Sequence, residues 1–528
     1  MTTVGIVGSG HTAIAVAKAL VRRGVRPIIL DVGETLDADR QAVVTRMSAQ
    51  RKTEWSGEDL AVVTHNPTVS QAKVLRLAFG SEYPYAGSRP SAPLDVVEDG
   101  PSPTMARGGY STIWGAAMLP GASCDLQAWP FPARDLDPFY ELVVRDLPFS
   151  ATNDALAREF PLYRDDLQAL APSPIVQSFL RTLDRSRFLR NRNDVAYGQA
   201  RVAVRANDDA DAPGCVYCGR CLSGCVYGSI YSSEQDLRKM IRAEEVDYRS
   251  GRTVIEFTER GNEVEVRCDT SGGHERVVVN RLFVAAGALN STRLVLESKR
   301  LYDQPVVMKT TQGFVVPMVS LRSAPFEWPN ANTLSGVFFD FKVPSISDNW
   351  IHSQISPANE LILAKLGYRA NNKFFDNVRK LALRRLLIGI CNFHSDVTGS
   401  YLLRLKPALA SKRSVLSVTI EPSTSFANVM KKGSRRLTRL LSMAGVFPVS
   451  PLMYGDPLKP IGWHFGGTLP MTKAPSDEVH TDLLGRPKGW ERIHVVDSSV
   501  FPSVPATTVA FLAMANATRI AQNAPLED

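Results

Sequence analysis

The sequence contains no long hydrophobic run. None of its segments has the eighteen consecutive apolar residues that a helix needs to cross a bilayer. The first residues, MTTVGIVG, also lack the charged region, the apolar stretch and the small-residue cleavage site of a secretory signal peptide. We therefore expect a cytoplasmic protein, with any membrane contact limited to the periphery of the inner membrane surface.

Cysteine is scarce, with seven in 528 residues, but four of the seven are clustered. Their spacing, Cys215-x2-Cys218-x2-Cys221-x3-Cys225, is that of a bacterial ferredoxin motif, except that Val226 replaces the usual proline. In a reducing compartment, clustered cysteines bind metals or act in catalysis more often than they form disulfides. The run therefore predicts an iron–sulfur cluster. The alternative is that the four cysteines are small, packed structural residues.

Acidic residues are scarce in one region. The net charge is +8, but residues 361–446 contain 16 lysines and arginines and only 3 acids. This excess predicts either a solvated basic face or attraction to an anionic substrate, an acidic protein or a membrane surface. Nucleic-acid binding is not expected, because no recognisable binding motif accompanies the charge. Two basic pieces, 379–387 and 434–445, have helical patterns, and the leucines of the second share one face, which indicates core packing.

The N-terminal segment, VGIVGSGHTAIAVAKALVRRGVRPIILDVG, has the pattern of a strand, a glycine turn, an amphipathic helix and a second strand. Gly8 permits the tight turn, Gly10 lets the backbone approach a pyrophosphate, and Ala13 allows close packing of helix and strand. The helix N-terminus offers partial positive charge to the phosphates. Asp31, at the end of the second strand, is placed to accept hydrogen bonds from an adenosine ribose. The segment predicts a dinucleotide-binding unit.

Distant segments bear on which dinucleotide is bound. RGGYSTIWGAAMLP (107–120) has a double glycine, which lets the backbone pass close to a flat or charged group. RLFVAAGALNSTRLVLES (281–298) is predicted to form a strand, a glycine turn and a helix. IGWHFGGTLPM (461–471) precedes residues 492–522, which are predicted to form a strand, a polar turn and a final apolar helix.

These segments, in this order, resemble the glucose–methanol–choline (GMC) family of FAD-dependent oxidoreductases. The nearest branches are the pyranose oxidases, the bacterial sugar dehydrogenases and the long-chain alcohol oxidases. The resemblance implies that the N-terminal fingerprint binds the ADP half of FAD, that the double glycine lies along the isoalloxazine, and that the V-V-D-x-S-V-F-P block contacts the ribityl and pyrophosphate. The implied FAD-binding residues are Gly8, Gly10, Ala13, Asp31, Gly108, Gly109, Ser111, Trp114, Gly287, Asp497 and Ser498.

The same resemblance bears on how the flavin is attached. The stretch STIW is similar to the S-T-H-W of the pyranose oxidase branch, whose histidine is bonded covalently to the flavin. Ile113 stands in the place of that histidine. The resemblance therefore implies FAD that is bound non-covalently.

The resemblance assigns a catalytic role to His464, in the segment H-F-G-G-T. An imidazole with a pKa near the working pH can take the hydroxyl proton of an alcohol while hydride leaves the carbon. Family members usually add a second His or Asn near the start of the last helix, where this chain has Thr507 and Thr508. A threonine can orient a hydroxyl but cannot act as a base near neutral pH. We expect His464 to act alone as the base, with a threonine orienting the substrate; the alternative is a different substrate or reaction.

The predicted architecture is α/β, with two interleaved parts. A Rossmann-like FAD-binding domain is built from the discontinuous segments 1–150, 201–300 and 461–528, and its middle segment includes the cysteine run. A sheet-and-helix (α+β) substrate domain is formed by residues 301–460. Residues 151–200 form a further substrate-domain or cap segment.

The predicted activity is oxidation of a hydroxyl group by hydride transfer to flavin N5. The expected substrate is a sugar or sugar conjugate, including anionic or lipid-linked ones. An iron–sulfur cluster would pass electrons to an acceptor protein or a quinone, which favours a dehydrogenase over an oxidase. The alternatives are a long-chain or sterol alcohol oxidase, a flavoprotein electron-transfer component without alcohol oxidation, and an NAD enzyme.

Overall fold

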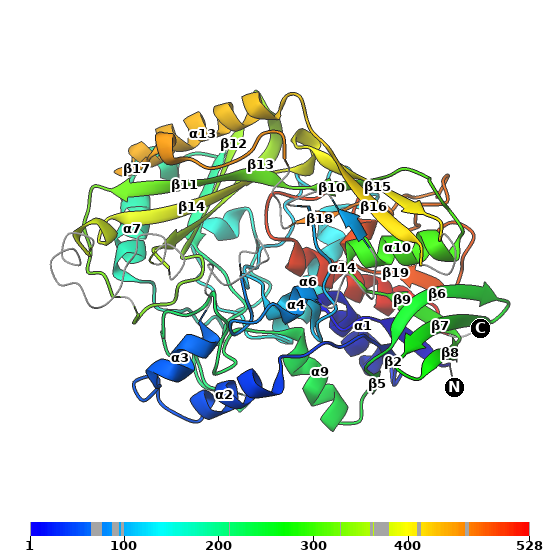
Figure 1. Cartoon of the computed structure of the whole chain (residues 1–528). Helices are drawn as coiled ribbons and strands as arrows, with labels where there is room; N and C mark the ends of the chain where they lie inside the picture. Colours follow the sequence, from blue (N-terminus) through cyan, green and yellow to red (C-terminus); the bar gives the residue numbers. More distant parts are fainter. Residues whose placement is uncertain are drawn as a thin grey trace.

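The computed structural model describes residues 2–64, 76–86, 94–96, 100–210, 212–327, 329–359, 363, 380–408, 413–459 and 464–526. The strands in these ranges form four sheets, with five, five, six and three strands. No helix within the same ranges combines the length and the apolar character that a membrane crossing requires. The mixed α/β fold confirms the predicted fold class, and Figure 1 shows both chain termini close together beside the same sheet.

One five-stranded sheet collects strands from the beginning, the middle and the end of the chain. Its order is β19-β9-β1-β2-β5, and every neighbouring pair is parallel. The strands are β1 (Val4–Val7), β2 (Ile28–Leu30), β5 (Asp247–Arg249), β9 (Arg281–Val284) and β19 (Ile493–Val495). The predicted N-terminal unit and the strands expected in 281–298 and 492–522 are therefore confirmed.

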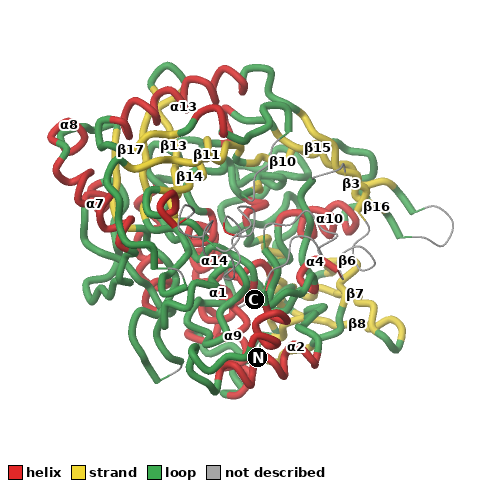
Figure 2. The backbone as a smooth tube through the Cα atoms, turned by 60° about the vertical axis from the view of Figure 1, so that its left-hand side comes forward, coloured by secondary structure: helices red, strands yellow, loops and turns green. Residues whose placement is uncertain are grey.

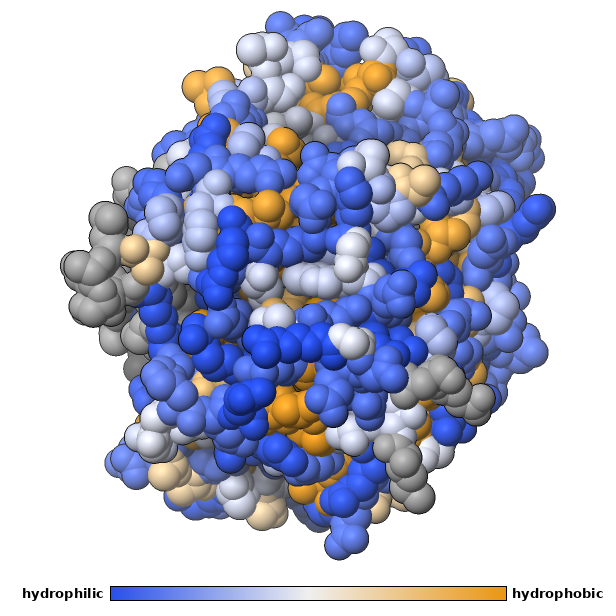
Figure 3. All heavy atoms as spheres, turned by 90° about the vertical axis from the view of Figure 1, so that its right-hand side faces the viewer, coloured by the Kyte–Doolittle hydropathy of each residue, from blue (hydrophilic) through white to orange (hydrophobic). Residues whose placement is uncertain are grey.

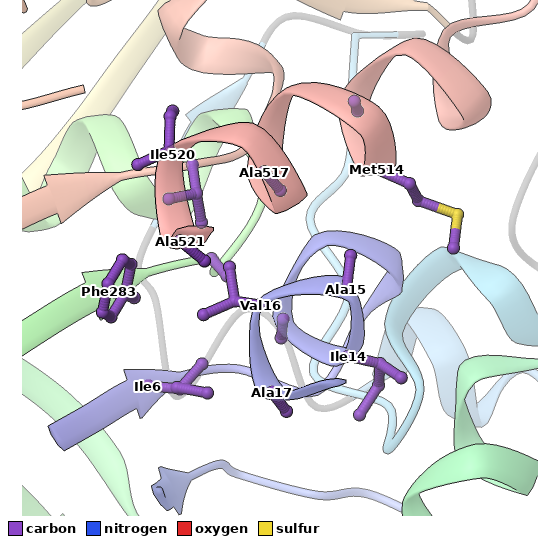
Figure 4. Packing of buried hydrophobic residues seen from close by; sticks show 14 of the residues in the cluster. Ile6, Ile14, Ala15, Val16, Ala17, Phe283, Met514, Ala517, Ile520 and Ala521 are labelled. Atoms are coloured by element: carbon purple, nitrogen blue, oxygen red, sulfur yellow. The ribbon is translucent and has the colours of Figure 1, made fainter. Parts of the chain in front are cut away.

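Two helices at opposite ends of the chain pack together against this sheet. Helix α1 (His11–Arg22) follows β1, and α14 (Val509–Asn523) is the last helix among the described residues. Figure 4 shows Val16 of α1 between the small side chain of Ala521 on α14 and the sheet residues below. Alanines at such a contact let two helix backbones approach closely, so the pair buries its apolar faces tightly.

A six-stranded sheet forms a second part of the molecule. Its order is β17-β11-β14-β13-β12-β4, and every neighbouring pair is antiparallel. The strands are β4 (Val195–Gln199), β11 (Gln312–Ser320), β12 (Val337–Val343), β13 (Ser347–Pro357), β14 (Leu386–Phe393) and β17 (Val446–Pro448). Helix α13 (Phe426–Ser442) covers its outer face, and Figures 1 and 2 show α13 on the side away from α1 and α14.

Alternation along β12 and β13 divides their side chains between the two faces of this sheet. Phe339 packs in the apolar cluster that includes α13 on the outer face, whereas Phe338 packs with Leu119 and Trp350 in a separate cluster on the inner face. Because successive side chains on a strand point to opposite faces, Asp340 lies on the same inner face as Phe338. The inner face is thus the one that meets the segment following the double glycine.

The second five-stranded sheet holds the segment that contains the predicted catalytic histidine. Its order is β18-β10-β15-β16-β3, and β18 (Phe465–Gly466) pairs with β10 (Val306–Thr310). The remaining strands are β3 (Leu94–Val96), β15 (Ser400–Lys406) and β16 (Val415–Glu421). The three-stranded sheet of β6 (Thr253–Arg260), β7 (Glu263–Thr270) and β8 (Gly273–Val279) lies at one end of the molecule. Figure 3 shows that this end is mostly hydrophilic, with apolar residues in small islands.

The basic region only partly follows its predicted helices. Residues 434–442 belong to α13, and the leucines Leu437, Leu440 and Leu441 are buried, so the predicted core packing is confirmed. The helix predicted for 379–387 is wrong beyond residue 383, because β14 begins at Leu386 and its alternate residues fill the sheet core. Residues 361–362, 364–379 and 409–412 of the basic region lie outside the described residues.

Candidate active site

The turn between β1 and α1 needs glycine for both conformation and space. Gly8 has a φ of +96°, and a Cβ atom there would lie 2.7 Å from the carbonyl oxygen of Ala285. Gly10 caps the N-terminus of α1 and faces Gly109, since a Cβ at Gly109 would lie 3.1 Å from the Cα of Gly10. The double-glycine segment therefore packs directly on the nucleotide-binding turn. Ala13 is fully buried within the first turn of α1.

Asp31 connects three segments at the end of β2. Its Oδ2 accepts a hydrogen bond of 2.5 Å from Ser9 Oγ and one of 3.1 Å from the hydroxyl of Tyr248. The same Ser9 Oγ accepts a hydrogen bond of 2.9 Å from the amide of Gly108. Burial raises the pKa of Asp31 to about 6, against the opposing effect of these hydrogen bonds. The predicted ribose-binding acid thus lies beside both the N-terminal turn and the double glycine.

Asp497 joins the loops that follow β9 and β19. Its Oδ2 accepts hydrogen bonds from the amide of Gly287 at 2.9 Å and from Ser291 Oγ at 2.5 Å. Its Oδ1 accepts from the amide of Ser499 at 3.0 Å. Burial raises the pKa of this carboxyl, while the hydrogen bonds from Ser291 and Ser499 oppose the rise. The contacts of Asp497 therefore fix the backbone at the edge where the nucleotide turn lies.

Ser111 and Trp114 use their polar atoms within the protein. Ser111 Oγ donates to the carbonyl of Gly108 at 2.5 Å, and Trp114 Nε1 donates to the carbonyl of Tyr231 at 2.8 Å. The ring of Trp114 contacts the imidazole of His11, with centroids 4.3 Å apart. Both residues therefore shape the nucleotide turn rather than present free polar atoms.

His11, at the start of α1, was not predicted. Its side chain is half-buried, the loss of solvent around the ring lowers its pKa to about 4, and its shielded Nε2 has no hydrogen-bond partner among the described residues. A buried, neutral ring nitrogen of this kind needs a partner, because an unpaired polar atom costs about 1–3 kcal/mol. The cradle at Gly10 and Gly109 and the unpaired His11 fit a bound dinucleotide. Its position directly after Gly10 is the only sequence signal that marks it.

The predicted catalytic histidine lies beside the double-glycine segment. The ring of Phe465, next to His464, contacts the ring of Tyr110, with centroids 6.5 Å apart. Ser498 Oγ donates to the carbonyl of Phe465 at 2.8 Å, which ties the histidine segment to the Asp497 loop. Burial lowers the pKa of His464 to about 4, and its Nδ1 has no hydrogen-bond partner in the part of the chain that the structure describes.

The two threonines before α14 differ in what their hydroxyls do. Thr508 is the N-cap residue of α14, and its Oγ1 accepts a hydrogen bond of 2.8 Å from the amide of Leu119. Thr507 is fully buried, and its Oγ1 has no partner among the residues described. The structure therefore brings Thr508 to the segment that follows the double glycine, and it leaves Thr507 as the threonine with an available hydroxyl.

Four charged or titratable residues on or against the inner face of the six-stranded sheet were not predicted from the sequence. We call Asp125, Arg201, Asp340 and His352 the inner polar group. Each is at most 1% exposed, and each has at least one polar side-chain atom without a partner among the described residues. They come from separate segments, so only the register of the strands and the packing of loops bring them together. For His352, the alternation of side chains along β13 was the only signal in the sequence.

The contacts of the inner polar group are specific. His352 Nδ1 lies 2.8 Å from Asp340 Oδ1, and the two residues are register partners on β13 and β12. Arg201 Nη1 donates to the carbonyl of Phe160 at 2.6 Å, and Asp125 Oδ1 accepts from a backbone amide of β13 at 2.9 Å. Burial raises the pKa of Asp125 to about 6 and lowers that of Arg201 to about 10.

In the described part of the chain, the four cysteines of the run are not arranged as a metal-binding group. No set of three or more His, Cys, Asp or Glu side chains among the described residues is arranged to hold a metal ion, and none of the described cysteines forms a disulfide. Cys215 Sγ accepts from Asn332 Nδ2 at 3.6 Å, and Cys225 Sγ accepts from a backbone amide at 3.2 Å. Burial raises the pKa of Cys218 to about 11, which keeps that thiol protonated. This arrangement gives the predicted iron–sulfur cluster no support.

Comparisons with known proteins agree with this fold. Residues 411–517 match the family model GMC oxidoreductase, in its C-terminal part. The solved structure of pyridoxine 4-oxidase from Mesorbium loti superposes with a TM-score of 0.59, covering 99% of each chain at 16% sequence identity. At that identity the likeness is one of fold. No curated protein matches the sequence.

The parallel sheet completed by a C-terminal strand, and the histidine segment beside its glycine turn, agree with this match. Residues 411–517, the C-terminal part of the chain, are similar to the GMC oxidoreductases, a class of FAD-dependent enzymes that act on CH–OH donors.

Proposed function

We propose that this protein oxidises a hydroxyl group of a small polar alcohol, in the class of sugars and sugar conjugates, with His464 as the group that accepts the hydroxyl proton. The observation that carries this proposal is the half-buried His464, whose Nδ1 is shielded from solvent and has no partner among the described residues, and whose neighbour Phe465 contacts Tyr110 of the double-glycine segment. Because burial lowers its pKa to about 4, this imidazole is neutral at pH 7 and presents a lone pair to a hydroxyl. Bound FAD would supply the hydride acceptor, and Ile113 supports non-covalent attachment.

Thr507 and Thr508 have different proposed roles. Thr507, with its unpartnered hydroxyl within the described part of the chain, orients the substrate oxygen towards His464. Thr508 holds the start of α14 against the backbone of Leu119, so it keeps the site in register. Neither is a base, since a hydroxyl side chain does not lose its proton near neutral pH.

The inner polar group supports a polar substrate. Unpartnered atoms of this group include the acceptor Asp340 Oδ2 and the donor Arg201 Nη2, when partners are sought among the described residues. Hydroxyl groups both donate and accept, so a polyhydroxylated compound can pair with such a mixed set. A long-chain or sterol alcohol would leave these buried atoms unpaired, at about 1–3 kcal/mol each.

The basic region supports an anionic partner or a negatively charged membrane surface. On α13, Lys431, Arg435 and Arg439 are exposed and follow one another at four-residue spacing, so they lie on one face of the helix. Arg436 is not part of this row, because it forms an ion pair of 2.5 Å with Asp194. A row of three cations can attract an anionic substrate or a membrane surface, which agrees with a cytoplasmic protein of peripheral membrane contact.

Anaerobic flavin bleaching tests the proposal. The purified holoprotein is mixed with sugars, sugar conjugates and long-chain alcohols in turn, and the flavin absorbance near 450 nm is followed. We expect a polyhydroxylated alcohol to bleach the flavin, and His464→Ala to lose about 100-fold or more in rate while retaining FAD. His274→Ala is the matched control, because that histidine is an exposed residue of β8. Bleaching by sterols or long-chain alcohols alone would overturn the proposed substrate class, and an unchanged rate in His464→Ala would overturn the role of that histidine.

A further inference from the structure

His464 is the one imidazole assigned so far to the proposed proton transfer, and neither Thr507 nor Thr508 can act as a second base. The hydroxyl of Thr508, at the start of α14, already accepts a hydrogen bond from the amide of Leu119. His464 has no hydrogen-bonded carboxylate within the described residues, and a base whose pKa lies near 4 holds a proton poorly at pH 7. Oxidation of a hydroxyl nevertheless releases one proton inside this buried site. Another side chain is therefore needed to hold that proton.

The pair of His352 and Asp340 has the geometry of such a group. His352 Nδ1 and Asp340 Oδ1 lie 2.8 Å apart, and both side chains are fully buried. A carboxylate behind Nδ1 fixes the tautomer that carries hydrogen on that nitrogen, which turns the lone pair of Nε2 outward. Nε2 has no partner among the described residues. The same carboxylate stabilises the imidazolium that forms when Nε2 takes a proton.

The register of the sheet directs this pair towards the histidine segment. Across the inner face, Asp340 pairs with His352, His352 pairs with Asn392, and Asn392 pairs with Gly313 at the start of β11. Two residues before Gly313, the amide of Thr311 donates to the carbonyl of His464 at 2.9 Å. The row that holds the pair therefore ends beside the backbone that holds His464.

The charges around the pair favour one shared proton. A positive charge on His352 lowers the pKa of His464, so the two imidazoles oppose simultaneous protonation. Burial is the largest effect on the pKa of Asp340 and raises it, whereas His352 and Arg201 lower it. Asp340 in turn raises the pKa of Asp125. A proton received by His352 would lie next to a carboxylate, whereas a proton on His464 has no hydrogen-bonded carboxylate among the described residues.

We propose that His352 is a second catalytic residue of this enzyme, with Asp340 as its positioning residue. Nε2 of His352 lies at the substrate hydroxyl opposite His464. The proton of the substrate O–H bond passes to His464 and then to His352 Nε2, and FAD, when bound, would accept the hydride that leaves the carbon. The inference rests on the proposed hydroxyl oxidation and adds the final position of its proton. The second imidazole comes from the substrate-side sheet instead of the last helix.

The test compares stopped-flow anaerobic flavin reduction in wild type, His352→Gln and Asp340→Asn, with a polyhydroxylated alcohol that bleaches the wild-type flavin. We expect His352→Gln to reduce the rate by about 100-fold or more. Asp340→Asn is expected to reduce it by about tenfold or more and to move the acidic limb of the pH–rate profile to lower pH, because the imidazolium loses its carboxylate. The control is Ser353→Ala, a buried neighbour on the opposite face of β13, which should keep the wild-type rate and profile.

The outcomes separate the two proposals. Wild-type rates and pH profiles in both His352→Gln and Asp340→Asn, with full FAD content, would overturn the role of the pair and leave the role of His464 standing. A wild-type flavin that no alcohol reduces would overturn both. If His352→Gln loses FAD, Asp340→Asn decides by its pH profile, which a merely structural role would not shift.

Discussion

The amide of Thr311 donates a hydrogen bond of 2.9 Å to the carbonyl oxygen of His464. This contact ties the histidine segment to the residue just before β11, and hence to the six-stranded sheet. The next residue, Phe465, contacts the ring of Tyr110 in the segment that carries the double glycine. His464 thus lies where the six-stranded sheet meets the nucleotide-binding part. Substitutions in either part are therefore expected to affect its position.

The two threonines should respond differently to removal of their hydroxyls. Thr508→Ala leaves the buried amide of Leu119 without its partner, so we expect a loss of about 1–3 kcal/mol in the free energy of unfolding. Thr507→Ala should change stability little, because its hydroxyl has no partner among the described residues, but should raise KM or lower kcat. Urea unfolding and steady-state kinetics on both variants, with Thr507→Ser as the control, check this. Equal stability losses would contradict it.

Gly8 should tolerate no side chain. Gly8→Ala combines a left-handed backbone conformation with a Cβ atom 2.7 Å from a carbonyl oxygen, so we expect loss of FAD together with a large loss of stability. Gly24→Ala is the matched control, since its φ of +75° is also left-handed but no atom lies within 4 Å of the added Cβ. That variant should lose only about 1 kcal/mol and keep its FAD. Flavin content and urea unfolding measure both effects, and full FAD in Gly8→Ala would contradict the steric argument.

Acid should destabilise the protein through its buried histidines. Burial lowers the pKa of His494 from its ordinary value of 6.5 to about 4, so the folded state binds the proton less tightly than the unfolded state. Its contribution to stability is full above pH 6.5 and falls as the pH drops towards 4, by up to about 3 kcal/mol. His494→Gln, which can still donate to the carbonyl of Leu484, should flatten this part of the stability curve. Urea unfolding at pH 4.5, 5.5 and 7 measures it, and parallel curves would contradict the prediction.

The cysteine run should be reduced and free of iron. We expect purified protein to show flavin bands without stoichiometric iron or acid-labile sulfide, because the described cysteines are not arranged around a metal. Burial raises the pKa of Cys218 to about 11, so its thiol should react slowly with thiol reagents at pH 8 and rapidly after denaturation. Stoichiometric iron and sulfide in an anaerobic preparation would contradict this and restore a protein or quinone acceptor. Without iron, oxygen or a soluble acceptor is the expected destination of the electrons.

The sequence was most informative where local chemistry alone dictates the structure. The strand, turn and helix around Gly8 and Gly10 follow from turn conformation and helix periodicity, and so does the strand and helix of residues 281–298. Because backbone geometry constrains these positions within a few residues, a short window of sequence was sufficient to predict them.

The inner polar group could not be predicted in this way. Asp340 and His352 are partners only because β12 and β13 pair in one register, which a shift of a single residue would reverse. Arg201 and Asp125 reach the same face from loops. The basic residues before Leu386 also misled the helix prediction there, since the strand that follows is selected by its position in the sheet core.

The position of β19 and α14 has a consequence for biosynthesis. β1 pairs with β9, which in turn pairs with β19, so the sheet that begins with the first residues is finished by residues 493–495. A ribosome adding about 5–20 residues per second would need roughly half a minute or more to reach that strand. During that time the apolar faces of α1 and β9 have no C-terminal partner. In the nascent chain these faces therefore stay without their native partner until β19 and α14 have been made, and the sheet that carries the nucleotide turn is incomplete before then.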